Sequence, residues 1–96
     1  MRILALEKEV PGASAGNLTA RLQEEARAVW ELTQAGIIRE IHFRDDRSQA
    51  VIMLEANGTA QAEEVLAQLP LVKAGLIEFE VIGLLPYPGF ARLFRR

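Results

Sequence analysis

The order of apolar patterns along the chain is the feature that most constrains its fold. Two segments have the three- to four-residue apolar spacing of amphipathic helices, and four shorter ones have the alternation or the short apolar run of strands. In chain order these patterns predict a strand at 2–8, a helix at 18–35, strands at 37–44 and 49–56, a helix at 59–69 and a strand at 76–84. The predicted order is therefore β-α-β-β-α-β.

Capping and turn residues separate these segments. Asn17 is a good N-cap for the first helix, and Gly36 suits the position directly after its end. Pro70 is expected to end the second helix. The polar turn at 45–48 joins the second and third strands as a hairpin. Together these features predict an α+β fold of the ferredoxin-like type over residues 1–84, with a four-stranded antiparallel sheet and both helices on one face.

Composition narrows the class of protein. The chain has 96 residues, enough for one small domain, and its 50% apolar and 25% charged residues are typical of a globular protein. The net charge of -2 gives no basic surface for nucleic acid. The absence of cysteine excludes disulfides, thiolate catalysis and cysteine-bound metals. The apolar run near the N-terminus is interrupted at Glu7 and is too short for a signal peptide or a membrane span, so a cytoplasmic protein is expected.

The sheet face away from the helices is predicted to be half apolar. The residues assigned to it are Ile38, Glu40, His42, Gln49, Val51, Met53, Glu78, Glu80 and Ile82. Such a face is too apolar to lie in water, so we expect a second subunit to cover it in a homo-oligomer. The tail at 85–96 is rich in aromatic residues and is predicted to be an arm that packs on a neighbouring subunit; the alternative is that it folds back over its own domain.

One carboxylate falls on the apolar side of the first helix. At about 100° per residue, Glu25 lies in the middle of the apolar stripe, whereas Glu24 lies on the opposite side of the helix. The other members of the stripe are Leu18, Leu22, Val29 and Leu32. Glu25 is thus the candidate functional residue of this helix.

A second charge is assigned to the same layer by an independent pattern. Strand alternation places Arg39 on the inner sheet face together with Ile41 and Phe43. Glu25 and Arg39 could flank a cavity, in which burial raises the pKa of the carboxyl and the guanidinium lowers it. The alternatives are a plain ion pair, or two long side chains that reach outward to water.

Several short motifs resemble the muconolactone isomerase family. They are "AGIIRE" after the first helix, "LAQLPL" at the end of the second and "EFEVIGLLPYP" near the C-terminus, and the family has a Glu where Glu25 stands. The resemblance covers about Leu22 to Pro88. It implies ferredoxin-like subunits in a dimeric α+β barrel, assembled into higher oligomers, that isomerise an unsaturated lactone without metal or cofactor.

The resemblance also implies roles for the two charges. Glu25 would carry a proton from one carbon to another, and Arg39 would stabilise the oxygen charge of the dienolate. The second strand departs from the family, which has more Trp and His there. A non-catalytic oligomeric module that binds a small molecule and a cofactor-free monooxygenase of the same fold are the alternatives.

Four further residues are candidates for a pocket or an interface. His42 is the only histidine and lies with Glu40 on the outer face, where it could be a base at a subunit junction or a plain interface residue. Phe43 and Tyr87 could line a pocket, and Tyr87 could close that of a neighbour or only anchor the packing. One histidine with scattered carboxylates is a weak metal signal, so no metal site is predicted.

Overall fold

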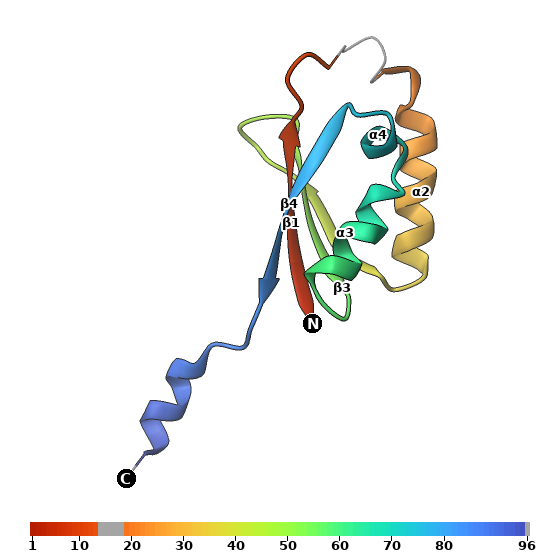
Figure 1. The fold of residues 1–96 in the computed structure, drawn as a ribbon. Helices are drawn as coiled ribbons and strands as arrows, with labels where there is room; N and C mark the ends of the chain where they lie inside the picture. Colours follow the sequence, from red (N-terminus) through yellow and green to blue (C-terminus); the bar gives the residue numbers. More distant parts are fainter. Residues whose placement is uncertain (14–18, 96) are drawn as a thin grey trace.

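The computed structural model describes residues 1–13 and 19–95, and its elements follow the predicted order (Figure 1). The strands are β1 (Arg2–Glu9), β2 (Ile38–Phe43), β3 (Ala50–Glu55) and β4 (Ile77–Leu84). The helices are α2 (Leu22–Gln34), α3 (Thr59–Ala67), the short α4 (Pro70–Lys73) and the 3-10 helix η1 (Pro88–Phe94). The predicted N-cap Asn17 and the stripe residue Leu18 lie outside the described residues.

The four strands form one antiparallel sheet in the order β2-β3-β1-β4, and α2, α3 and α4 lie on one face of it (Figure 1). In register, Ile3 pairs with Leu54 and Ala5 with Ile52, so these apolar residues point together towards the helices. All four are at most 1% exposed. The predicted ferredoxin-like α+β fold is confirmed.

A β-bulge in β2 corrects the predicted faces of two residues. Ile38 pairs with Leu54 and Glu40 with Met53, which leaves Arg39 as an extra residue in the strand. The inserted residue shifts the alternation by one position. Ile38 therefore lies in the core, 1% exposed, and not on the outer face, whereas Arg39 is exposed and not held in the helix–sheet layer. Beyond the bulge the prediction is correct, since Ile41 and Phe43 pair with the inner-face residues Ile52 and Ala50.

The ends of the helices follow from glycine and proline. Gly36 has φ +77°, and the amide groups of Gly36 and Ile37 donate to the carbonyl oxygens of Thr33 and Leu32 at 3.1 and 3.0 Å, which completes the predicted C-terminal cap of α2. α3 ends at Ala67, close to the predicted end. Pro70 is the first residue of α4, a turn of helix that was not predicted.

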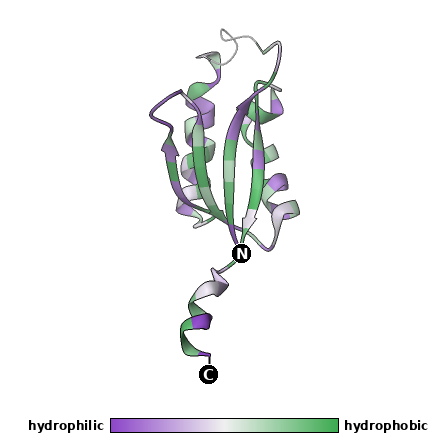
Figure 2. Ribbon diagram, turned by 90° about the vertical axis from the view of Figure 1, so that its left-hand side faces the viewer, coloured by the Kyte–Doolittle hydropathy of each residue, from purple (hydrophilic) through white to green (hydrophobic). Residues whose placement is uncertain are grey.

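The opposite face of the sheet has no helix over it in the described residues (Figure 2). It carries half-buried apolar side chains among charged ones, and its apolar members include Leu4, Leu6, Val51, Met53, Ile82 and Leu84. Glu40 and His42 lie on this face, as predicted. The surface therefore has the mixed character expected from the alternation.

The arm, residues 85–95 of the described chain, extends away from the domain and does not fold back over it (Figure 1). Its large apolar side chains are 66–81% exposed: Leu85, Tyr87, Phe90, Leu93 and Phe94. The rings of Tyr87 and Phe90 meet edge to face, with centroids 4.9 Å apart. A Cβ atom at position 89 would collide with the end of the Tyr87 ring, so a larger residue there would require the exposed ring to move. None of the helices described in residues 1–13 and 19–95 could span a bilayer, since none combines the required length and apolarity.

Candidate functional site

A cavity of about 270 Å³ lies between α2 and the sheet. Apart from two carboxylates, its lining is apolar, and Phe43 and Phe79 supply aromatic rings. The complete lining is Glu7, Leu22, Glu25, Ala26, Val29, Ile41, Phe43, Ala50, Ile52, Leu71, Ile77 and Phe79. We call this space the carboxyl cavity.

Helix α2 supplies one wall of the cavity through four residues. Leu22, Glu25, Ala26 and Val29 have the i, i+3, i+4, i+7 spacing of one helix face. The predicted position of Glu25 in the apolar stripe is therefore confirmed, and Glu24 is exposed as expected. The first half of α2 covers the cavity, while Ala28, Val29 and Leu32 pack against the core.

An amide group of α4 anchors Glu25. The N–H of Leu71 donates to Oε1 of Glu25 at 3.0 Å. Leu71 is the second residue of α4, where backbone N–H groups have no acceptor within the helix. The bond therefore satisfies both partners and directs the carboxyl group of Glu25 into the space beneath α2.

The second carboxylate, Glu7, was not predicted as a site residue. Its Oε1 accepts a hydrogen bond of 3.0 Å from the N–H of Ala50, beyond the last backbone pair that joins β1 to β3. The alternation in β1 places Glu7 on the same face as Ile3 and Ala5, both of which are fully buried. The alternation in β1 was therefore the signal in the sequence that Glu7 faces the helices. It was missed because a charged residue at the end of a strand is usually exposed to solvent.

The apolar surroundings change the acidity of both groups. Burial raises the pKa of Glu25 above its ordinary value of 4.5, and the negative charge of Glu7 raises it further, whereas the Leu71 amide opposes the shift. Burial also raises the pKa of Glu7, and the Ala50 amide opposes it. Each carboxyl therefore holds its proton to higher pH than an exposed Glu, and the negative charge of Glu7 strengthens this effect for Glu25.

The other predicted site residues are distributed over different parts of the molecule. Phe43 lines the carboxyl cavity and is 64% exposed, which places it at the opening. Arg39 is exposed at the bulge and is not part of the lining, so the structure does not bring it to Glu25. His42 and Glu40 contact each other on the outer face, with Nε2 and Oε1 3.3 Å apart. Tyr87 is on the arm.

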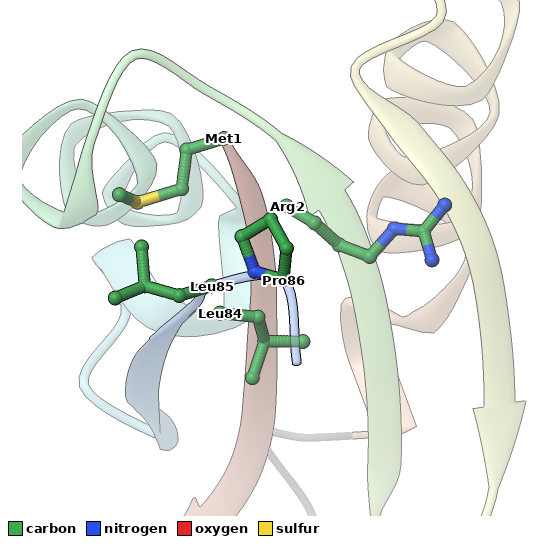
Figure 3. Close-up of a pocket in the computed structure, with 5 residues that line it drawn as sticks. All are labelled: Met1, Arg2, Leu84, Leu85 and Pro86. Atoms are coloured by element: carbon green, nitrogen blue, oxygen red, sulfur yellow. The ribbon is translucent and has the colours of Figure 1, made fainter. Parts of the chain in front are cut away.

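A larger hollow, of about 480 Å³, lies where the arm leaves the domain (Figure 3). It is lined by Met1, Arg2, Leu84, Leu85 and Pro86. The Arg2 side chain extends to the side opposite Met1 and Leu85, so the space between those two is apolar (Figure 3). This hollow is larger than the carboxyl cavity, but no carboxyl group is among its lining residues.

The carboxyl cavity can therefore hold a small apolar molecule against two groups able to exchange protons. Across residues 1–13 and 19–95, no cluster of three or more His, Cys, Asp or Glu has the arrangement needed to hold a metal ion. None of the lining residues of the cavity is Lys, Arg or His. Acid–base exchange by carboxyl groups is the chemistry that these side chains offer.

Comparison with known proteins shows the fold. No family model matches the chain, and no curated protein matches it. Among solved structures, the chain is similar to 5-chloro-2-hydroxyhydroquinone dehydrochlorinase (TftG) from Burkholderia phenoliruptrix AC1100, determined in complex with 2,5-dihydroxybenzoquinone. The TM-score is 0.62 with 21% sequence identity, and the match covers 88% of this chain and 93% of that one.

Proposed function

We propose that this protein is a cofactor-independent enzyme that moves a proton within a small carbonyl compound, with Glu25 as its acid–base group. The observation that carries the proposal is the setting of Glu25: an apolar cavity, a fixed hydrogen bond to Leu71 and a raised pKa. A general acid–base group is most effective when its pKa lies near the working pH, and burial shifts that of a carboxyl in this direction.

The reaction class is the shift of a double bond next to a carbonyl group. A C–H bond breaks, its electron pair forms the new double bond, and the carbonyl oxygen takes up charge as a dienolate. Return of a proton at the other carbon restores the carbonyl group and leaves an isomer of the starting compound. Glu25 would exchange the proton with the substrate. Isomerisation of an unsaturated lactone, as in the family that the sequence resembles, is the specific form of this proposal.

The lining favours an uncharged substrate of about one ring. A volume of about 270 Å³ is at the small end for ligand pockets. A substrate that bears a carboxylate would meet two glutamates and no cationic side chain among the lining residues. The similar solved structure holds 2,5-dihydroxybenzoquinone, an oxygenated six-membered ring. We therefore propose a neutral unsaturated lactone or a related cyclic carbonyl compound.

A homo-oligomer is part of the proposal. The half-apolar outer face of the sheet and the exposed arm are two surfaces that a second copy of the chain could cover. Light scattering on the full chain and on a chain that ends at Leu84 tests this point. We expect an oligomer for the full chain and a smaller species for the shortened one; a full chain that stays monomeric at high concentration would contradict it.

Glu25→Gln tests the catalytic role with little change of shape. The Gln side chain keeps an oxygen that can accept the Leu71 amide but cannot exchange a proton. With a β,γ-unsaturated γ-lactone that has no carboxylate, we expect kcat/KM to fall by about 10²–10⁴-fold. Glu24→Gln, one residue away on the exposed side, is the matched control and should keep full activity. Equal turnover by the two variants would refute the role of Glu25.

A non-catalytic binding module of the same fold is the second candidate. It is favoured by the absence of Lys, Arg and His from the cavity lining, because an oxyanion intermediate needs a donor. On this hypothesis the wild-type protein binds the lactone or a cyclic enone, seen as chemical-shift changes of cavity residues, and releases it unchanged.

A further inference from the structure

Glu7 is a cavity residue for which the proposed function has no role so far. It reaches the carboxyl cavity from β1, on the sheet side, while Glu25 reaches it from α2, on the helix side. A ligand between α2 and the sheet would therefore have a carboxyl group on each side. The two groups are close enough for the charge of one to affect the acidity of the other.

Each of the two carboxyls is anchored by one oxygen only. Oε1 of Glu7 accepts the Ala50 amide and Oε1 of Glu25 accepts the Leu71 amide, both at 3.0 Å. Among residues 1–13 and 19–95 the structure records no hydrogen bond to either Oε2. One oxygen of each pair thus fixes the side chain, and the second is left to act on a ligand.

Among the described residues that line the cavity, no other titratable group faces the pair. Glu7 and Glu25 are the titratable residues of β1 and α2 in the lining, and the other elements present apolar side chains: Ile41, Phe43, Ala50, Ile52, Leu71, Ile77 and Phe79. Two like charges in an apolar space repel each other strongly, so loss of the first proton makes loss of the second harder. Over an interval of pH the pair therefore holds one proton.

We propose that Glu7 and Glu25 act as one catalytic pair that shares a proton, in which the ionised carboxyl moves the substrate proton while the neutral carboxyl donates a hydrogen bond to the carbonyl oxygen. This inference rests on the proposed function and assigns the donor that the reaction needs. The ionised carboxyl takes the proton from one carbon, and the oxygen that gains charge accepts a hydrogen bond from the O–H group of the neutral carboxyl. The first carboxyl then returns the proton to the other carbon, so both carboxyls end in their starting states.

The shared proton follows from the surroundings. The charge of one carboxyl opposes ionisation of the other, so the pair keeps one proton after the first is lost. A neutral carboxylic acid inside an apolar cavity is a strong donor to an oxygen that gains negative charge. The neutral member of the pair can therefore serve as the oxyanion donor, the role that the resemblance implied for Arg39.

The pH dependence of kcat/KM tests this proposal. We expect a bell-shaped profile for the wild type, because the singly protonated pair exists only between its two ionisations. Glu7→Gln keeps an oxygen for the Ala50 amide and should lower kcat/KM by about 10²-fold or more. Glu9→Gln, an exposed residue of the same strand, is the control and should leave the profile unchanged.

A second measurement separates a catalytic role from a structural one. Carbon-13 NMR titration of the labelled Glu side chains should show that Glu7→Gln lowers the pKa of Glu25, because the opposing charge is removed. Full activity in Glu7→Gln, or an unchanged Glu25 titration, would overturn the pair while Glu25 kept its role. A wild-type protein without turnover on any neutral unsaturated lactone would overturn the proposed function itself, and the catalytic pair with it.

Discussion

α2 and α3 cover the same face of the same sheet, yet they bury their apolar sides to different extents. α3 has 9 residues and places Ala62 and Leu66 in the core, at 0% and 2% exposed. α2 has 13 residues and no buried residue at all. The longer helix is incompletely packed because the carboxyl cavity, and not a layer of side chains, lies beneath its first half. The comparison shows that the layer under α3 is filled by buried side chains, whereas the layer under the first half of α2 contains a cavity.

Truncation of one leucine in each helix is the strongest test of this contrast. Leu66→Ala in α3 removes a fully packed side chain and should lower the free energy of unfolding by about 2–5 kcal/mol. Leu22→Ala in α2 removes a side chain that is 50% exposed and should cost about 1 kcal/mol or less. Urea unfolding of both variants measures the difference. Equal losses would mean that α2 is packed as tightly as α3.

Enlargement of an alanine under each helix tests the same contrast in the opposite direction. Ala62→Leu adds volume where none is free and should destabilise the protein by about 1–3 kcal/mol. Ala26→Leu adds volume at the carboxyl cavity and should change stability by about 0.5 kcal/mol or less. It should also weaken ligand binding, which titration with a neutral lactone or enone would detect. A strong loss of stability in Ala26→Leu would show that the cavity has no room.

The pH dependence of stability is the smallest of the expected effects. A carboxyl whose pKa is raised by folding favours the folded state below its unfolded value of 4.5, and this advantage is lost as the pH rises through the higher folded pKa. Glu25→Gln should therefore remove a decline in stability that begins near pH 4.5. The difference should stay below about 1 kcal/mol, because solvent screens a half-buried group.

Unfolding curves of wild type and Glu25→Gln across pH 4–8 provide the measurement, and Glu24→Gln is the control. The control should follow the wild-type curve. A Glu25→Gln curve that also follows it would mean that folding leaves the acidity of Glu25 unchanged.

Much of the fold could be predicted from the sequence because it depends on periodicity. The stripe on α2 placed Glu25 correctly, and Gly36 marked the end of the helix. The faces of β2 beyond the bulge were also predicted. These features are local, since side chains three or four residues apart share a helix face and alternate residues share a strand face.

The two errors in the predicted site have a common origin, because both depend on contacts between elements that are distant in the sequence. The bulge at Arg39 depends on the register between β2 and β3, and the sequence of β2 alone does not indicate it. Glu7 was passed over because a charge at the end of a strand is usually exposed, whereas α2 reaches over it here. Both differences changed the candidate site. Arg39, which was predicted to belong to it, does not line the cavity, and Glu7, which was not predicted, does.

By itself the sequence determined the order of the elements, the face that each helix buries and the presence of a carboxylate on the wrong side of α2. Only the tertiary structure decided which groups surround that carboxylate, Glu25. The turn of helix at α4 brings the Leu71 amide to Glu25, and the pairing of β1 with β3 brings Glu7 to the opposite wall. Periodicity within a segment determines the direction in which a side chain points. The group that it contacts can come from a distant segment, as Leu71 does, 46 residues along the chain from Glu25, and only tertiary packing brings the two together.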